Sequence, residues 1–323
     1  MPANIQFREI DIATDPAFPA AMKVADSGRP WYPQTPEDYR EYRRFNEGMP
    51  HVDVVAEDGL GTVVGWLSVS QNKHEFVPGK FHVELAVAPA WRRRGLGGRL
   101  LDRAVETVRS LGGSGLVAWV DREDPAWTRW AEARGFACTQ VSCDVVLDLR
   151  VAAIPSDDAI EEAARAAGVR VTTFAQLERE YPDARRRLHA MAEDVKRDIP
   201  SPDPLPPVSF EDYTTALESP LRIPDAQFVA LRGDALVGMS TLWRRGADAV
   251  LETGITAVVR GERGKGLATL LKWHAVRYAL SIGAPHIITD NAEENAAMRA
   301  INARLGFTAL PGTWRMERSL AAG

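Results

Sequence analysis

The sequence RRRGLG occupies residues 92–97, and RGKGLA occupies residues 263–268. Each stretch stands between an apolar, strand-like run and a run with apolar residues at helical spacing. Glycine in such a turn lets the backbone approach an anion closely, and the free N–H groups of the first helical turn carry the positive end of the helix dipole. Both stretches therefore predict a cradle for a pyrophosphate. The structural alternative for either one is a tight strand-to-helix turn with incidental arginines.

The two stretches belong to an internal repeat. Adding 171 to a position aligns the two halves without a gap from Ala86 to Phe136, and matching glycine and apolar positions recur over that length. In each half the periodicity predicts a meander of strands and then strand, helix, strand and helix, which implies a mixed sheet with helices on both faces. Duplication of a single α/β unit explains both halves.

Two other phosphate-binding motifs are excluded by inspection. Gly266 follows Lys265 where a P-loop requires Ser or Thr. A dinucleotide-binding fingerprint that began at Gly95 would need Gly or Ala where Leu100 stands.

The length of 323 residues suggests two domains, since roughly 100 to 200 residues per domain is usual. Ile154-Pro155-Ser156-Asp157 interrupts the chain between the halves. We therefore expect an N-terminal domain over residues 1–150, a linker over 151–168 and a C-terminal domain over 169–323. A proline-rich loop at residues 199–208 is expected to be a linker or a wall that faces substrate.

Composition narrows the range of partners. A formal net charge of −5 argues against general affinity for nucleic acid or anionic membranes, and no apolar run approaches the roughly 20 residues of a membrane helix. Cys138 and Cys143 are the only cysteines and the chain does not open with a secretory pattern, so we expect a cytoplasmic protein. The six histidines share no metal-binding spacing, and no metal is expected. The protein is expected to be a monomer or a homodimer.

The two hexapeptides match the Q/R-x-x-G-x-G/A signature of the GNAT acetyltransferase superfamily, and each half ends its last core helix with the Gly-Phe pair typical of that family. The chain resembles the tandem-domain, mycothiol synthase-like type. This resemblance implies an α/β (α+β) fold with two GNAT-like domains, each a mixed, mostly antiparallel sheet flanked by helices. It also implies acetyl-CoA as the cofactor, with the thioester near the strand ends at Val87 and Val258. The implied cofactor-binding residues are Ala257, Val258, Arg263, Gly264, Lys265, Gly266, Leu267, Ala268 and Asn295 in the second half, and Val87, Arg92, Arg93, Arg94, Gly95, Leu96 and Gly97 in the first.

Transfer to an amine needs a base that removes a proton from the ammonium group. Many family members have a glutamate five residues before the alanine aligned here as Ala257, and that position is Glu252 in the second half but Phe81 in the first. Strand alternation should point Glu252 and Gly254 toward the cleft, where burial would raise the glutamate's pKa. The alternative is an exposed glutamate paired with Lys or Arg. Glu84 is the nearest candidate in the first half, on the other face of its strand.

A tyrosine that often protonates the leaving thiolate in this family is replaced here by Ala131 and Asn302. The amide of Asn302 could hydrogen-bond the sulfur, and a thiolate with a pKa of about 8.5 can leave without full protonation. Asn295 could contact the cofactor arm or simply cap a helix, and Asp124 is its counterpart.

These residues predict an acetyl-CoA-dependent N-acetyltransferase that acts on a primary amine of a small molecule. The amine attacks the thioester directly, and catalysis lies mainly in the C-terminal domain with Glu252 and Asn302. Two alternatives remain open at this point: a non-catalytic acyl-CoA-binding or sensing protein, which the missing tyrosines favour, and a peptide or protein N-acetyltransferase.

Overall fold

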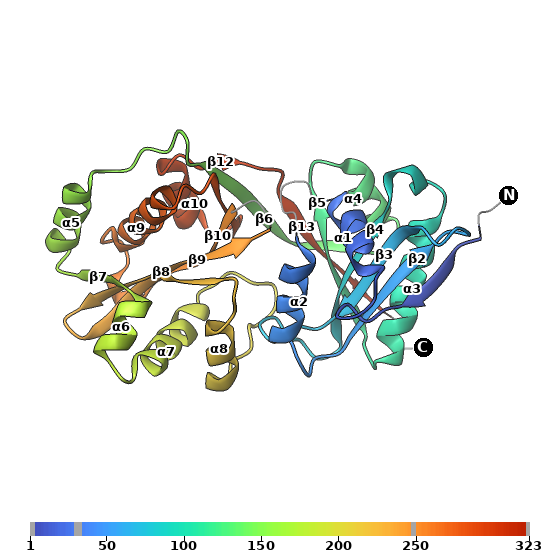
Figure 1. Ribbon diagram of the computed structural model, residues 1–323, viewed down its shortest axis with the longest axis horizontal. Coiled ribbons are helices and arrows are strands. Elements are labelled where there is room, and N and C mark those ends of the chain that lie inside the picture. Colours follow the sequence, from blue (N-terminus) through green and yellow to red (C-terminus); the bar gives the residue numbers. More distant parts are fainter. Residues whose placement is uncertain (1–3, 29–33, 247–249, 321–323) are drawn as a thin grey trace. The chain divides into compact units, whose positions relative to one another are not determined.

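The computed structural model describes residues 4–28, 34–246 and 250–320 (Figure 1). The chain forms two compact units that are interleaved along the sequence. Unit 1 comprises Met1–Val141, Pro202–Pro206 and Thr313–Gly323, and unit 2 comprises Ser142–Ser201 and Pro207–Gly312. Residues 142–150 thus belong to unit 2 and residues 313–323 to unit 1, whereas the boundaries expected from the sequence assign them to the opposite domains.

Unit 1 contains a mixed, mostly antiparallel sheet in the order β1-β2-β3-β4-β5-β13-β6, in which β4 and β5 pair in parallel. Its strands are β1 (Gln6–Glu9), β2 (His51–Glu57), β3 (Val63–Ser70), β4 (Lys80–Val87), β5 (Gly115–Asp121), β13 (Thr313–Ser319) and the first residues of β6 (Ala137–Asp148). Its helices are α1 (Phe18–Asp26), α2 (Pro36–Phe45), α3 (Leu96–Ser110) and α4 (Pro125–Glu132), with a 3-10 turn at Pro89–Trp91.

Unit 2 repeats this plan in the order β6-β11-β10-β9-β8-β7, with β10 and β11 as the parallel pair and β12 also paired to β6. Its further strands are β7 (Arg170–Thr173), β8 (Arg222–Arg232), β9 (Ala235–Arg245), β10 (Val250–Val258), β11 (His286–Ala292) and β12 (Thr308–Ala309). Its helices are α5 (Asp157–Ala166), α6 (Phe174–Glu180), α7 (Ala184–Lys196), α8 (Phe210–Leu217), α9 (Leu267–Ser281) and α10 (Ala296–Arg304), with a 3-10 turn at Arg260–Glu262.

One strand in the sheet of each unit, β13 or β6, comes from the other half of the sequence. β13 pairs with β5 from Thr313↔Asp121 to Ser319↔Gly115, and β6 pairs with β11 from Ser142↔Ala292 to Asp148↔His286. These long ladders satisfy the backbone groups of both partners, which fixes where each strand lies.

Helices cover both faces of each sheet, as predicted. In unit 1, Trp66 packs in the cluster of α1 while its neighbour Leu67 packs in the cluster of α3, because successive strand residues point to opposite faces. The same alternation in unit 2 sends Ala257 to the α6–α7 side and Val258 to the α9 side. Helices α3 and α9 bury apolar residues at intervals of four, and these residues correspond one to one: Leu96, Leu100, Ala104 and Val108 in α3, and Leu267, Leu271, Ala275 and Ala279 in α9.

The sequence of residues 176–197 predicts one helix, but the structure has two with a break between them. Tyr181 is extended, with φ −129° and ψ 114°, and separates α6 from α7. The next residue is Pro182, whose ring disfavours the helical conformation of the residue before it. Helices α1 and α8 were not expected from the periodicity.

In residues 4–28, 34–246 and 250–320, none of the helices combines the length and the hydropathy that a bilayer crossing requires.

Candidate functional site

The two glycine-rich turns have the same backbone conformation. Arg93 and Gly264, which are 171 residues apart, have φ of 62° and 76°, and the N-cap residues Gly95 and Gly266 have φ of 84° and 81°. Alternating left-handed and right-handed conformations at such a turn direct successive N–H groups into one concavity, which is a common anion-binding arrangement. The structure therefore forms the same turn twice, once in front of α3 and once in front of α9, at the two positions where the sequence predicts a cradle.

Both cradles are open. The N-cap residue is glycine in both α3 and α9, so among the described residues no N-cap side chain accepts a hydrogen bond from the first-turn amides. A Cβ added at Gly95, Gly264 or Gly266 would meet no heavy atom within 4 Å. These three positions thus border open space at the positive end of a helix dipole, and the residues of both turns fit a diphosphate.

The first arginine of each motif holds the turn in place. Arg92 Nε donates to the carbonyl oxygen of Val87 over 3.0 Å, and Arg263 Nε donates to that of Val258 over 2.9 Å. Each guanidinium therefore ties the turn to the end of the preceding strand. This contact leaves the backbone amides, rather than the Nε of these arginines, to bind an anion.

The basic groups around the second cradle have partners within unit 2. Asp198 pairs with both Arg260 and Arg263, whose hydrogen bonds hold the pKa of that carboxyl well below its usual range. Lys265 Nζ lies 3.1 Å from Glu262 Oε2. The second cradle therefore combines main-chain donors with a rim in which two carboxylates offset part of the charge of three basic groups.

A gap opens between the parallel strands beside each cradle. β10 pairs with β11 only at Leu251↔Ile287 and Glu252↔Ile288, and β4 pairs with β5 only from Lys80↔Gly115 to His82↔Val117. Beyond these rungs β10 continues to Val258 and β4 to Val87 without pairing to the parallel neighbour. The free backbone edge ends at the cradle, so an extended ligand could pair with it as a further strand does.

A β-bulge distinguishes unit 2 from unit 1. Thr253 pairs with Leu242 and Thr256 with Ser240, so two residues of β10 stand opposite the single residue Thr241. The N–H of Ile255 leaves the ladder and donates to Thr241 Oγ1 over 3.1 Å. In contrast, β4 keeps an unbroken register with β3 from Val87 to His82.

Glu252 lies at the fork where β10 and β11 separate. Its neighbour Leu251 packs in the α9 cluster, so Glu252 points to the opposite face, which α6 and α7 cover. The carboxylate is half-buried, and its Oε2 lies 2.6 Å from Arg245 Nε. Glu252 thus has the ion pair given as the alternative interpretation, and its role as a base stays a prediction.

Asn302 on α10 is almost fully buried, and its Nδ2 donates to Asn291 Oδ1 over 2.7 Å. The Oδ1 atom of Asn302 is buried and has no hydrogen-bond partner among the described residues. One N–H of the predicted donor amide is therefore already engaged, and the buried Oδ1 can accept a hydrogen bond. Asn295 Oδ1 accepts from Met298 N over 3.3 Å, so this residue caps α10.

Sequence alignment gave the wrong counterpart for Glu252. Phe81, at an offset of 171, is 2% exposed and packs in the α3 cluster on the other face of β4. The bulge adds one residue to β10, so the spatial counterpart of Glu252 is His82, which pairs with Val117 as Glu252 pairs with Ile288. An isolated glycine in a strand pattern, Gly254, was the available signal for this bulge. Arg245 gave no signal in the sequence.

Comparison with known proteins identifies the family. The model described as "Acetyltransferase (GNAT) family" matches residues 13–136 and residues 188–307, one match in each half. The chain belongs to the GNAT acetyltransferase family. The predicted family, the tandem of GNAT domains and the enzyme class, an N-acetyltransferase, are thereby confirmed.

Individual relatives agree with this assignment. The chain is 28% identical over 232 residues to the mycothiol acetyltransferase of Thermobispora bispora, covering 70% of this chain and 72% of that one. It is 26% identical to the mycothiol acetyltransferase of Geodermatophilus obscurus, covering 82% of each. Among solved structures, a tandem GNAT protein from the clavulanic acid biosynthesis pathway has a TM-score of 0.74 at 22% identity, covering 99% of this chain and 100% of that one. A GCN5-related N-acetyltransferase from Sphaerobacter thermophilus has a TM-score of 0.71 at 17% identity, with 99% and 96% covered. The two structures share the fold of this GNAT chain.

Proposed function

We propose that this GNAT protein transfers the acetyl group of acetyl-CoA to the primary amine of a small molecule, and that the C-terminal half performs the main reaction. The observation that carries the proposal is the position of Glu252, at the fork of β10 and β11 and next to the bulge on a strand that ends at an open cradle. The proposed proton acceptor and the free strand edge thus lie along β10, and the anion cradle follows that strand in unit 2. The names of the curated relatives support a small-molecule acceptor.

Each part of this site has a defined task in the proposed reaction. The first-turn amides of α9 bind the diphosphate of acetyl-CoA, and the free edge of β10 up to Val258 pairs with the amides of its pantetheine arm. Glu252 accepts a proton from the ammonium group of the acceptor, which frees the nitrogen lone pair. The lone pair attacks the carbonyl carbon, the C–S bond breaks, and its electron pair stays on the sulfur as a thiolate.

After the attack the amine nitrogen loses a second proton, which reaches the thiolate through water. Asn302 would lie at the thiolate side of this exchange, since its position is that of the tyrosine missing from the family pattern. With Nδ2 bound to Asn291, Asn302 offers Oδ1 to the S–H of the product thiol.

Substitution of Glu252 tests the proposal. Glu252→Gln keeps the size of the side chain but removes the base, and we expect kcat/KM for thiol release from acetyl-CoA in the presence of an amine to fall by about 10²-fold or more. Glu161→Gln on the exposed side of α5 is the matched control and should leave the rate unchanged. Equal rates for Glu252→Gln and the native protein would reject Glu252 as the base.

Two contacts favour the second candidate function, binding of an acyl-CoA without turnover. Arg245 Nε lies 2.6 Å from Glu252 Oε2, and one N–H of the Asn302 amide donates to Asn291. A calorimetric titration with acetyl-CoA that shows binding, together with no thiol release over a panel of amines, would establish this function. Steady thiol release with any of those amines would exclude it.

A further inference from the structure

His82 holds in unit 1 the place that Glu252 holds in unit 2. Each is the last β4 or β10 residue that pairs with the parallel neighbour before the strands separate, and their partners Val117 and Ile288 are 171 residues apart. His82 shares a face of β4 with Ala86, which packs in the α1 cluster. Both side chains therefore point to the equivalent face at the equivalent fork.

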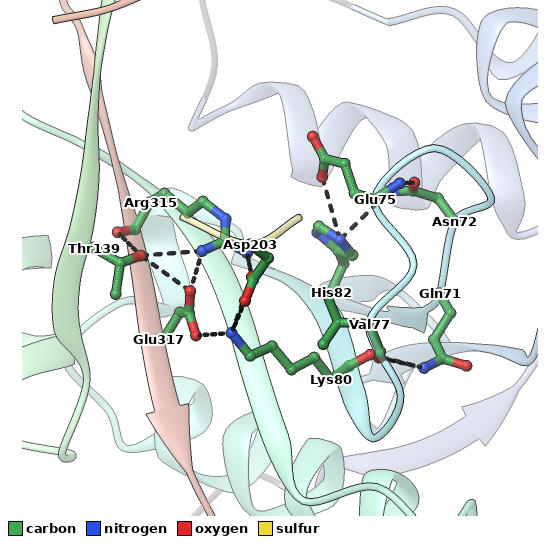
Figure 2. A network of polar contacts seen from close by, with 10 residues as sticks. All are labelled: Gln71, Asn72, Glu75, Val77, Lys80, His82, Thr139, Asp203, Arg315 and Glu317. Carbon is green, nitrogen blue, oxygen red and sulfur yellow. Dashed lines mark hydrogen bonds and ion pairs between the residues drawn. The ribbon is translucent and has the colours of Figure 1, made fainter. Parts of the chain in front are cut away.

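The hydrogen-bonding groups around His82 leave Nε2 as the proton-accepting atom. Asn72 Nδ2 and Glu75 Oε2 both lie 3.4 Å from Nε2 (Figure 2). An amide nitrogen can only donate, so the Nε2 lone pair accepts from Asn72 and the proton of the neutral ring is on Nδ1. Glu75 is placed to stabilise the imidazolium once Nε2 gains a proton. The His82 side chain is 19% exposed, which leaves it within reach of a ligand.

Burial and several charged groups shift the pKa of the His82 ring. Burial is the main effect that lowers the pKa of His82, and Arg315 lowers it further, whereas Glu75, Asp203 and Glu317 raise it. Lys80 on the same face of β4 pairs with Asp203 at 2.7 Å and with Glu317 at 2.6 Å, and Arg315 also pairs with both carboxylates (Figure 2). The ring is thus neutral, and able to accept a proton, at neutral pH.

The cradle in front of α3 retains the shape of the second one despite a conformational cost. Arg93 adopts a φ of 62°, where the second cradle has Gly264. A residue with a side chain is strained in this region, and such strain is typical of functional sites. The free edge of β4 from Val83 to Val87 leads to this cradle, as in unit 2.

We propose that unit 1 is a second acyl-transfer centre, in which His82 Nε2 accepts the proton of an amine substrate. The proposal rests on the proposed function for its acyl donor, an acyl-CoA. The ammonium group of the amine gives one proton to Nε2, and the nitrogen lone pair forms a bond to the thioester carbonyl carbon. The C–S bond breaks with its electron pair on sulfur, the second amine proton neutralises the thiolate through water, and His82 returns its proton to solvent.

This centre works more slowly than unit 2. β4 keeps an unbroken register with β3 and lacks the bulge that stands beside Glu252 in β10. The proposed function places the main reaction in unit 2, so the rate of unit 1 is the smaller of the two. We therefore expect the activity of unit 1 to be visible only when Glu252 is disabled.

The test measures thiol release in an E252Q background. The E252Q protein should retain a residual rate that falls in acid, at a pH lower than the ordinary histidine pKa of about 6.5, since the pKa of His82 is lowered and protonated His82 cannot act as a base. Adding H82Q should remove at least nine-tenths of that residual rate, and H82N should do the same. Adding H51Q, at an exposed histidine that opens β2, should leave the residual rate unchanged.

Thermal unfolding of each double variant identifies any loss that comes from misfolding, and His82 is followed independently by the NMR shift of its ring protons. That shift should move when CoA is added to E252Q and should not move when CoA is added to E252Q carrying G95V, because valine is strained at the φ of 84° found there. Equal residual rates for E252Q and E252Q/H82Q, no residual rate in E252Q, or a loss caused by E84Q in place of H82Q would each overturn the proposal. A full native rate in E252Q would instead reject Glu252 as the base of unit 2, while the comparison with H82Q would still decide the role of His82.

Discussion

Trp243 lies so close to Gly254 that a Cβ built on this glycine would be 2.2 Å from the indole Nε1 and 2.8 Å from Thr241 Oγ1. Trp243 also stands directly opposite Glu252 in the β9–β10 ladder. The glycine is thus what allows the indole to lie over the bulge, next to the proposed base.

Replacing Gly254 with alanine should therefore damage both stability and activity. The methyl group must displace the indole or straighten the bulge, and such overpacking typically costs about 1–3 kcal/mol of unfolding free energy. We also expect kcat/KM for acetyl transfer to fall, since the hydrogen bond from Ile255 N–H to Thr241 depends on the bulge. Urea unfolding and thiol release measure the two effects.

Gly59→Ala is the control, since a Cβ at Gly59 would meet no atom within 4 Å. It should change neither quantity. An alanine at position 254 with native stability and rate would show that neither the indole position nor the bulge matters for the reaction.

The ion pair between Arg245 and Glu252 allows a second prediction, in which the two partners respond differently. If the pair only stabilises the fold, R245Q and E252Q should have similar effects. If Glu252 is the base, E252Q should lower kcat by about 10²-fold or more, whereas R245Q keeps the carboxylate and should change kcat by less than tenfold. Steady-state kinetics of both variants, with thermal unfolding beside them, separates these cases. Equal losses of kcat in R245Q and E252Q would contradict the base assignment.

Local features of the site were predictable because they depend on local chemistry. The Arg92–Gly97 and Arg263–Ala268 turns each have a left-handed glycine as the N-cap and a helix immediately after it, and both features are visible in the sequence. The repeat at an offset of 171 also gave the order of the helices and strands around each cradle. These predictions needed no knowledge of how distant segments pair.

Features that depend on register or on pairing between distant strands were not predictable in the same way. A single extra residue in β10 moves the counterpart of Glu252 from Phe81 to His82, since one residue reverses the face of a strand. Likewise, nothing in the alternation of residues 142–149 or 313–319 says which sheet the strand joins, so the exchange of β6 and β13 was not foreseen. The break at Pro182 was the exception, because the rule for residues before proline was available from the sequence.

Arg93 allows a prediction about stability alone. A left-handed conformation costs a residue with a side chain about 1–2 kcal/mol, while glycine loses about 0.5–1 kcal/mol of additional chain entropy on folding. R93G should therefore raise the unfolding free energy by about 0.5–1 kcal/mol, as measured by urea unfolding. R94G, one residue further along and outside the left-handed region, should give no such gain. A loss of stability in R93G would mean that the Arg93 side chain makes contacts worth more than the strain.

Lys272 on α9 is buried, and its Nζ lies 5.1 Å from the centre of the Phe307 ring. Burial alone lowers the pKa of this lysine from its ordinary value of 10.5 to about 8. Between these two values the unfolded chain binds the proton more firmly than the folded protein does, so stability rises with pH through this window. Below about pH 8 the full cost of the buried charge is present.

K272M should remove that cost while filling the same space with an unbranched apolar side chain. A shift of this size corresponds to about 3 kcal/mol, and after relaxation of the site we expect a gain of about 1–3 kcal/mol in unfolding free energy at pH 7. The gain should shrink as the pH rises from 8 to 10.5, because the native lysine loses its proton in the folded state. K23M, at an exposed lysine of α1, should show neither the gain nor its pH dependence. Urea unfolding of the three proteins at pH 7 and pH 10 measures both, and a K272M protein less stable than the native one at pH 7 would show that the ammonium group is stabilised in its site.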